Sequence, residues 1–477
     1  MRRYTREVNL RRVSAFGIVV SISGLSGCVA YRPRVIEPPR LEQDFRNRSL
    51  TDSGLNDFVQ GAVRGTPAHW PPVSLDLQSI TWIAIYYSPD VRLARSQLRV
   101  AEAQIVVAGA RPNPSLSGDI GYNTSPESRG LFTLMPNFTI QTAGKRGYQI
   151  LQAERMAEAA RLVVGEVGWR VRSRARAALL DYLFSVRRRE LLRREEQLRS
   201  EIVQIFDRRL EAGEAARPEL DVFRVDLVTT QAALLAAEGE TARSHAALAS
   251  AIGVPLSAVE KVPVEWPPLD SPPPEDQLSL KTVHRAGLLH RIDIRRLVVE
   301  YAAADAALRL EVARQYPDIQ IGPGYTFEEG FSRYVFAGGL APVPVFHRNR
   351  GMIGVAEAER SRVEAQVEAV QAQAIGEIER ALAQYRSATV EWSEAARRLI
   401  VIRNEREEAA VKALEAGEGD RLAVAMTRLE SVTAERARLD ALARVQAALG
   451  ALEDAVQQPL EPGAIFPDPL STPRNLP

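Results

Sequence analysis

The pentapeptide Leu-Glu-Ala-Gly-Glu occurs twice in this chain, at residues 210–214 and 414–418. An arginine follows each copy, Arg217 after the first and Arg421 after the second. Each copy closes a long segment without proline, residues 148–212 and residues 353–416. A glycine that ends such a segment is typical of a helix C-terminus. We therefore predict a helix, a tight turn and a second helix at each copy.

The spacing between the two copies holds along much of the chain. The two arginines are 204 residues apart, and so are Gly147 and Gly351, which precede the long segments. Recurrence at a fixed separation takes precedence over local signals when a fold is predicted. We therefore predict an internal two-fold repeat, with repeat 1 at residues 75–253 and repeat 2 at residues 278–457.

The same order of elements is expected in both repeats. Repeat 1 should contain a helix, a β-hairpin at 114–141, a long helix at 148–212 and a helix at 218–252. Repeat 2 should contain a helix, a β-hairpin at 317–343, a long helix at 353–416 and a helix at 420–456. A proline-rich linker, residues 254–277, should pack outside the helices as an equatorial region, and a proline-rich tail covers residues 458–477.

The long segments predict helices that pack as coiled coils. A helix over residues 148–212 would be roughly 95 Å long, about three times the thickness of a bilayer core. In the second long segment a set of mostly apolar residues steps alternately by three and four, which is the 3.5-residue period of left-handed coiled coils. These residues are Ile375, Ile378, Leu382, Tyr385, Thr389, Trp392, Ala396 and Leu399.

Residues 1–27 have the character of a lipoprotein signal peptide. Arginines near the start precede an apolar stretch that is too short to span a membrane, and this stretch ends in Leu25-Ser26-Gly27-Cys28. That ending resembles a bacterial lipobox, which implies cleavage before Cys28 and attachment of lipid to its sulfur. Cys28 is the only cysteine, so no internal disulfide can form. Residues 28–74 should form an extended N-terminal arm with one short helix near Leu55.

Where each repeat leaves its helices, the apolar period changes to two. Ten-residue segments alternate between apolar and polar side chains and carry aromatics, a pattern typical of transmembrane β-strands. We expect the polar face, with Asp119, Asn137 and Gln320, to line an aqueous lumen, and the apolar face to meet lipid. The alternative is a pair of amphipathic hairpins that cover the end of a helix bundle.

Four strands from one chain cannot close a barrel in lipid. Open edges would leave unpaired backbone groups in hydrocarbon, and the smallest barrels have about eight strands. Several chains must therefore contribute to the barrel. Pro136, Pro323 and Pro342 fall within the predicted strands and cannot donate to a ladder, so they suggest bulges or strand ends.

Composition argues against several other functions. The chain has 61 basic and 60 acidic residues, and its arginine clusters alternate with glutamates on a helix, so nucleic acid is not an expected partner. Its five histidines lack the spacing of metal ligands, and no nucleophile or phosphate-loop motif is present. We expect no enzyme, no metal and no cofactor apart from the covalent lipid.

Taken together, the lipobox and the two repeats resemble the TolC-type outer-membrane factors of efflux and secretion systems. The segments Ala110-Arg111-Pro112-Asn113-Pro114 and Gly144-Lys145-Arg146 are similar to that family's motifs around its first hairpin. The run at 342–351, Pro-Val-Pro-Val-Phe-His-Arg-Asn-Arg-Gly, is similar to one in the heavy-metal branch, where aspartate commonly replaces His347. The resemblance implies a mainly α fold with a membrane β part.

The resemblance also implies partners and a location. The chain would form a homotrimer in the outer membrane, with a twelve-stranded β-barrel and an α-barrel tunnel through the periplasm. As the passive exit duct of a tripartite pump for metal cations or drugs, it would meet a periplasmic adaptor and an inner-membrane pump of the resistance-nodulation-division (RND) type. One alternative is an exit duct for type I protein secretion. Another is a structural periplasmic coiled-coil lipoprotein without a channel.

The two turns are the predicted periplasmic tip of the tunnel. The candidate gate residues are Gly213, Glu214, Arg217, Gly417, Glu418, Asp420 and Arg421. Three-fold symmetry would bring Glu418 and Asp420 towards the axis, where like charges repel unless an arginine pairs with them. Arg421, or an arginine of a neighbouring chain, would supply that partner. A plain turn with solvated charges explains the same residues without a gate.

Overall fold

The computed structural model describes residues 31–62, 70–122, 130–266, 269–274, 278–328, 331–395, 400–460 and 466. The signal peptide and Cys28 lie outside these residues. The chain divides into two compact units, residues 1–47 and residues 48–477. In the described part of the first unit, helix α2 (Pro38–Arg46) begins with two prolines, whose fixed φ and missing N–H suit a helix start.

The second unit is mainly helical, and its elements follow closely the order predicted from the sequence. Helices α4 (Leu77–Tyr87) and α5 (Pro89–Gly109) precede a β-hairpin, which α6 (Lys145–Glu211) and α7 (Arg217–Ile252) follow. After a 3-10 turn, η1 (Leu256–Ala258), helices α8 (Leu280–His290) and α9 (Ile292–Ala313) precede a second hairpin. Helices α10 (Arg350–Glu394), α11 (Ile400–Glu415) and α12 (Arg421–Val456) complete the unit.

The helix expected near Leu55 in the N-terminal arm is present as α3 (Ser53–Ala62). Its apolar side chains Leu55, Phe58 and Val59 are fully buried in the main core of the second unit. Three residues at spacings of three and one share a helix face, so burial of that face stabilises a helix in an otherwise proline-rich segment.

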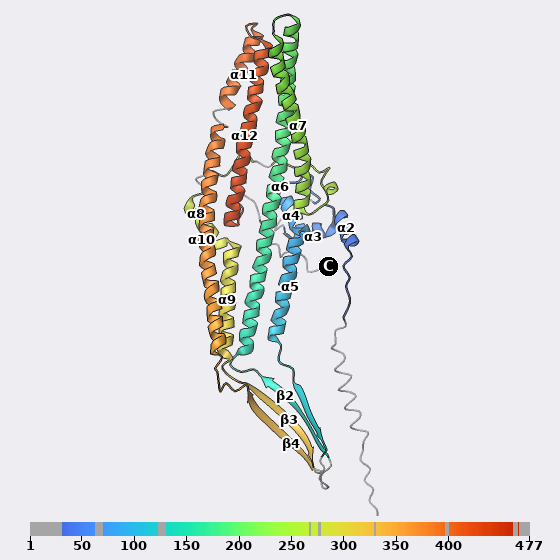
Figure 1. Ribbon diagram of the computed structural model, residues 1–477, viewed down its shortest axis with the longest axis vertical. Helices are drawn as coiled ribbons and strands as arrows, with labels where there is room; N and C mark the ends of the chain where they lie inside the picture. Colours follow the sequence, from blue (N-terminus) through green and yellow to red (C-terminus); the bar gives the residue numbers. More distant parts are fainter. Residues whose placement is uncertain are drawn as a thin grey trace, which may run out of the picture. The chain divides into compact units, whose positions relative to one another are not determined.

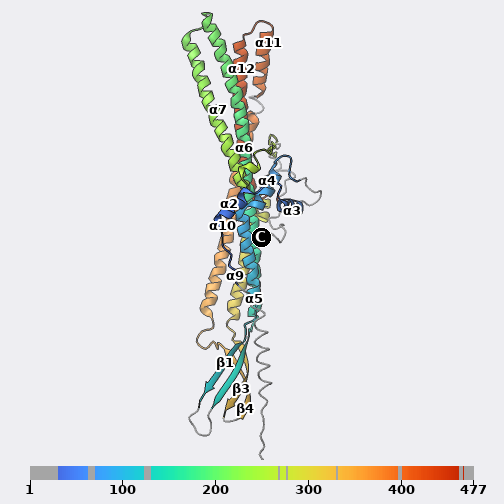
Figure 2. The same cartoon turned by 90° about the vertical axis from the view of Figure 1, so that its right-hand side faces the viewer.

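Helix α6 is the element around which the others pack. It contacts α7, α9, α5, α12 and α4. In Figures 1 and 2 the turns that join α6 to α7 and α11 to α12 lie at one end of the helices, and the strands lie at the other. Because α6 reaches from the sheet to the turn, it connects the two candidate sites of the chain.

The coiled-coil stripe predicted on the second long segment is confirmed where the structure describes it. Ile378, Leu382 and Tyr385 of α10 are buried, and they pack with residues of α8 and α12. The Tyr385 hydroxyl donates to the carbonyl of Pro273 at 2.5 Å, which ties the linker to the helices. Positions 396–399, which include the last predicted stripe residues, lie outside the described residues.

The linker packs against the helices as part of the core. Val254, Val259 and Leu269 are buried among residues of α3, α4, α6 and α7. Leu75, ahead of α4, forms a parallel bridge with Val264. Although the linker is dense in proline, its remaining apolar side chains thus help to hold the two halves of the unit together.

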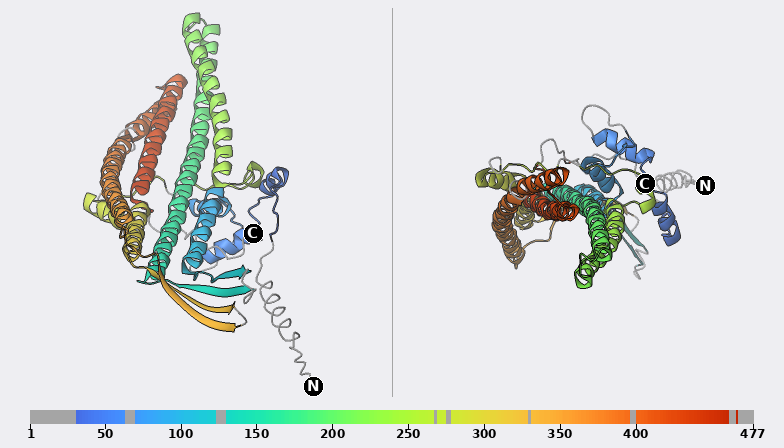
Figure 3. Two further views of the ribbon diagram at one scale, coloured as in Figure 1. Left: turned by 60° about the horizontal axis from the view of Figure 1, so that its bottom comes forward. Right: turned by 90° about the horizontal axis from the view of Figure 1, so that it is seen from above.

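The four strands form one antiparallel sheet in the order β1 (Ser115–Gly121), β2 (Leu131–Ile140), β3 (Asp318–Glu328) and β4 (Phe331–Ala341). Figure 3 shows them as a single layer. The two hairpins therefore join along β2 and β3, although these strands are far apart in the sequence. Strands β1 and β4 form the two edges of the sheet.

The prolines within the strands do not produce bulges. Pairing of β2 with β3 stops after Leu134 and Tyr325 and resumes at Phe138 and Ile321 in an unchanged register. Pro136 and Pro323 fall in this gap, where neither has an N–H to donate. The expectation of bulges was therefore wrong for these two, because the two missing donors coincide in one interruption of the ladder. The third proline directly follows β4, at a strand end as predicted.

Candidate functional site: the helical turns and the sheet

The two turns have the same backbone geometry. Gly213 and Gly417 have φ values of +78° and +76°, in the left-handed region that favours glycine. The N–H of each glycine donates to the carbonyl three residues earlier, at 3.0 and 3.1 Å. The N–H groups of Glu214 and Glu418 donate five residues back, at 2.8 and 3.0 Å. Each turn is thus a Schellman motif, which the repeated pentapeptide specifies locally.

An ion pair connects the two turns. Arg209, in the last turn of α6, pairs with Asp420, the N-cap residue of α12. Asp420 also accepts a hydrogen bond from the N–H of Leu422 at 3.2 Å, so its carboxylate caps the helix while it binds the guanidinium. The Arg209 guanidinium lies 5.8 Å from the ring centroid of Phe206. The predicted partner of Asp420 was Arg421 or an arginine of another chain, and no local pattern in the sequence indicates Arg209.

A small apolar cluster packs the same helices together next to this ion pair. Ile202, Ile205 and Phe206 of α6 are buried with Leu220 of α7 and Ala425 of α12. The pair itself is more open, since 32% of the Arg209 side chain and 51% of the Asp420 side chain are exposed. The helices are therefore joined near the tip by a small apolar cluster and by one solvent-accessible charge pair.

A shallow groove of about 260 Å³ lies beside the ion pair at the tip. Glu214 and Arg421 line it together with the ion pair. Arg217 and Glu418 are exposed to solvent. Within the described part of the chain, none of these four residues forms an ion pair. Three of the seven predicted tip residues, Glu214, Asp420 and Arg421, therefore line this groove, and a single ion pair among the described residues joins the two turns.

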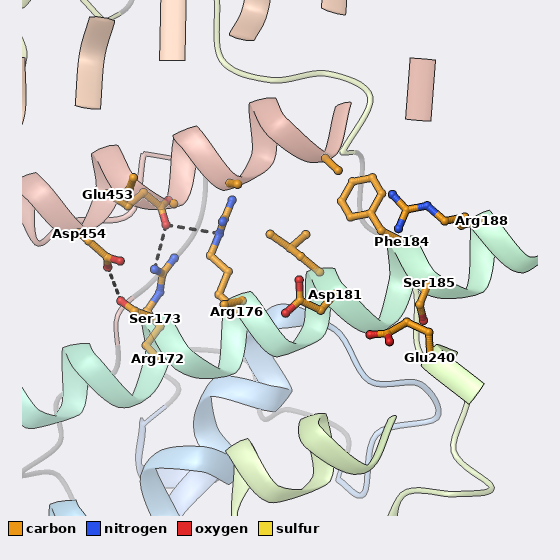
Figure 4. Close-up of a pocket in the computed structure, with 16 residues that line it drawn as sticks. Arg172, Ser173, Arg176, Asp181, Phe184, Ser185, Arg188, Glu240, Glu453 and Asp454 are labelled. Atoms are coloured by element: carbon orange, nitrogen blue, oxygen red, sulfur yellow. Dashed lines mark hydrogen bonds and ion pairs between the residues drawn. The ribbon is translucent and has the colours of Figure 1, made fainter. Parts of the chain in front are cut away.

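A buried polar network joins α6 to α12 further from the tip (Figure 4). Glu453 of α12 is completely buried and accepts a hydrogen bond from Arg172 of α6 at 2.9 Å. Arg176 lies 3.6 Å from the same carboxylate oxygen and donates to the backbone carbonyl of Gln446 at 3.0 Å. A Cβ on Gly450 would lie 2.6 Å from the Arg176 guanidinium, so glycine gives this arginine its room.

The carboxylate beside this network has an altered acidity. Asp454 accepts hydrogen bonds from the indole N–H of Trp169 at 3.0 Å and from the hydroxyl of Ser173. It keeps part of its surface open to solvent, but the surrounding helices desolvate the carboxylate and raise its pKa. Asp454 lines a cavity of about 580 Å³ between α6, α7 and α12. The acids and arginines around this cavity lie in a helix interface, which indicates a structural role.

The register of the sheet separates its two faces chemically. Asp119, Asn137 and Gln320, which we predicted to line a lumen, all lie on one face. This face also carries many small residues, and on it the side chain of Asn137 lies 2.7 Å from where a Cβ on Gly322 would be. The opposite face carries large apolar side chains from all four strands, namely Leu116, Ile120, Phe132, Leu134, Phe138, Ile140, Ile319, Ile321, Tyr325, Phe327, Tyr334, Phe336 and Leu340.

A buried lysine joins the sheet to the helices. The ammonium group of Lys145, at the start of α6, donates to Asp318 at 2.7 Å and to the carbonyl of Tyr316 at 2.6 Å. Asp318 begins β3 and also accepts from the N–H of Thr142 at 3.0 Å. The Gly-Lys-Arg motif noted in the sequence therefore links the first hairpin to the second.

The described residues contain neither a metal-binding cluster nor a membrane-spanning helix. These residues contain no group of three or more histidine, cysteine or acidic side chains arranged to hold a metal ion. No described helix has an apolar stretch long enough to cross a membrane. His347, in the run that resembles the heavy-metal branch, is exposed to solvent.

Comparisons with known proteins agree with this architecture. Residues 83–254 match the model of the outer membrane efflux protein family. No curated protein sequence matches the chain significantly. Solved structures of outer membrane channels share the fold of this chain, at sequence identities below 20%.

Three of these structures illustrate the similarity. The outer membrane protein VceC of Vibrio cholerae has a TM-score of 0.63 at 17% identity, over 81% of this chain and 97% of VceC. The open MtrE outer membrane channel of Neisseria gonorrhoeae has a TM-score of 0.63 at 16% identity, over 91% and 98% of the two chains. CusC has a TM-score of 0.63 at 18% identity, over 83% and 96%. The predicted resemblance to TolC-type factors is therefore confirmed.

Proposed function

We propose that this chain, which resembles the outer membrane efflux proteins in sequence over residues 83–254 and in fold over most of its length, is an exit duct of a tripartite efflux pump. Three copies would form a water-filled path from the periplasm through the outer membrane. The path is passive, and an inner-membrane pump of the RND type, reached through a periplasmic adaptor, supplies the energy.

The sheet carries this proposal. One of its faces is apolar and the other carries most of its polar side chains, and both of its edges, β1 and β4, are unpaired within the described part of the chain. Unpaired backbone groups cannot face hydrocarbon, so the apolar face can enter a bilayer only if each edge pairs with another copy. Three copies of four strands would give a closed barrel of twelve strands, well above the minimum of about eight.

The helical turns would form the periplasmic end of the same path. In a trimer, each Arg209–Asp420 pair holds the tip of α6 and α7 to the start of α12 within one chain. We propose that these pairs favour the closed arrangement of the tip. Because they are partly exposed, contact with an adaptor or pump could separate them at modest cost.

The proposed cargo class rests on sequence similarity in one segment. The run at residues 342–351 favours metal cations over drugs, by its similarity to the heavy-metal branch. A duct need not bind its cargo, so substrate selection would reside in the pump. Expression in a strain that lacks its own exit duct, with metal and drug tolerance measured separately, tests this assignment. Rescue of drug tolerance alone would contradict the metal assignment and leave the duct standing.

Reconstitution tests the duct itself. The purified protein should migrate as a trimer that heat dissociates, and it should conduct ions in a planar lipid bilayer. A structural lipoprotein without a channel would do neither. A duct for type I secretion would also conduct, but it would restore export of a protein substrate rather than tolerance to metals or drugs.

The lipid anchor is a separate part of the proposal. Cys28→Ala should abolish incorporation of radioactive palmitate. Assembled trimer should still be found in the membrane fraction, because a closed barrel with an apolar outer face holds itself in the bilayer without the lipid. Complete transfer of the variant to the soluble fraction would show that the sheet does not form a membrane barrel.

A further inference from the structure

The loop between β4 and α10 exposes apolar side chains at the junction of sheet and helices. Phe346 is 98% exposed, Val345 is 75% exposed and Val343 is 58% exposed. The N–H of Val345 donates to the carbonyl of Val343 at 2.9 Å, which closes a tight turn around Pro344. Since proline fixes φ, this turn is a defined conformation that keeps the apolar side chains outward.

Such exposure is unusual for a loop in water. Single exposed apolar residues are common on protein surfaces, but here three of four consecutive residues are apolar and open. Exposed phenylalanine is unfavourable in water and favourable in a less polar phase. The loop therefore requires a partner that accepts apolar side chains.

The residues that follow the loop carry positive charge. Arg348 and Arg350 are exposed, and within the described part of the chain neither forms an ion pair. Most other arginines of the second unit have a carboxylate partner, as Arg188 has in Asp440. Phe346 is thus followed by two arginines that form no ion pair among the described residues. This order suits the surface of a phospholipid leaflet, where apolar acyl chains lie next to anionic headgroups.

The position of the loop fits a lipid headgroup region. It begins where β4 ends, at the edge of the apolar face that carries Phe336 and Leu340. Beyond it, α10 begins at Arg350, and its acidic residues start at Glu357. Aromatic and basic side chains gather at this level of membrane proteins, because ring and stem lie in the apolar boundary while the charge reaches the headgroups.

We propose that the loop at residues 342–348 is a membrane-interface anchor that places Phe346 in the boundary of a phospholipid leaflet, with Arg348 and Arg350 on acidic headgroups. This inference rests on the proposed barrel, and it assigns a role to a run that sequence similarity had linked only to metal efflux. Lipid is favoured over a second copy of the chain because the apolar residues continue the apolar face of the sheet and because the two arginines have no carboxylate partner among the described residues.

Tryptophan fluorescence in vesicles that contain brominated lipids tests the location. Phe346→Trp, Phe138→Trp and Val228→Trp are each reconstituted as trimers, with the parent protein as the baseline. The added fluorescence of Phe346→Trp should be quenched about twofold more by bromine near the headgroup than by bromine near the chain end. Phe138→Trp, on the apolar strand face, should be quenched as well. Val228→Trp, an exposed site on α7, should not be quenched.

Comparing the quenching of Phe346→Trp with that of Phe138→Trp tests the anchor and the barrel separately. If Phe346→Trp escapes quenching while Phe138→Trp is quenched, the barrel stands and the anchor is wrong, because water or a second copy then surrounds the loop. If neither is quenched, the proposed barrel itself is wrong. Val345→Trp gives a second reporter in the same loop, with the same expected depth.

The acidic headgroup is tested by lipid class. Brominated phosphatidylglycerol at a small fraction should quench Phe346→Trp at least twofold more than the same fraction of brominated phosphatidylcholine. Adding Arg348→Gln and Arg350→Gln should remove that preference while leaving quenching by phosphatidylcholine unchanged. Equal quenching by both lipids in Phe346→Trp would overturn the assignment of acidic phospholipid.

Discussion

Asp420→Asn isolates the contribution of the ion pair at the tip. Asparagine caps a helix N-terminus about as well as aspartate, so α12 should keep its start while the charge pair with Arg209 is lost. The two side chains are 32% and 51% exposed, and such pairs contribute about 0.2 to 1 kcal/mol each. Three copies would then stabilise the closed trimer by roughly 0.6 to 3 kcal/mol, which changes the ratio of closed to open channels about 3- to 150-fold.

Single-channel recording in a planar bilayer measures this ratio. Asp420→Asn and Arg209→Gln should each raise the open fraction, and the double variant should add little, because both remove the same pair. Raising the salt concentration to about 1 M shortens the screening length to about 3 Å, so the parent should approach the variants. Glu418→Gln, next to the same turn but without an ion pair among the described residues, is the matched control.

Two results would refute the gate assignment. In the first, both single variants conduct like the parent at low salt. In the second, their effects add fully in the double variant, which would show that each residue acts through a different contact. Either outcome would leave the turn as a plain solvated tip.

Glu453→Gln should lower the free energy of unfolding by about 3 to 5 kcal/mol, because it removes the buried carboxylate that pairs with Arg172. Asp440→Asn, in an exposed pair, should cost less than about 1 kcal/mol, and denaturant titration followed by helical circular dichroism compares the two variants. Phe138→Arg should lower the stability of the membrane barrel by about 2 to 4 kcal/mol near the middle of the bilayer, and Gln320→Arg should lower it much less. Equal trimer yields of the two variants would contradict the assignment of the lipid and lumen faces. Because the pKa of Asp454 is raised in the folded protein, the free energy of unfolding should fall as pH rises from about 3.8, the ordinary pKa of aspartate, through the higher folded value. Asp454→Asn should flatten this fall in a series of thermal melts at different pH. If the variant and the parent show the same pH profile, Asp454 is not the cause of the fall.

The sequence by itself determined the features that depend on near neighbours. The turns at Gly213 and Gly417 follow from a local motif, since a left-handed residue and two backbone hydrogen bonds complete each turn within six residues. Strand alternation similarly predicted that Asp119 and Gln320 share a face, because successive side chains on a strand point to opposite sides. The helix starts differ from the predicted ones by three residues or fewer for the four principal helices.

Only the tertiary structure decided which distant residues meet. Arg209 and Asp420 are 211 positions apart, and Arg172 and Glu453 are 281 apart, so no local pattern could pair them among dozens of similar charges. Arg187, Arg188, Arg193 and Arg194 of α6 are exposed, as the sequence predicted, and only the neighbouring helices distinguish them from the buried Arg172 and Arg176. Likewise, Pro136 and Pro323 share one gap because β2 pairs with β3. Which strands pair, and in which register, depends on the packing of the whole sheet and cannot be read from either strand alone.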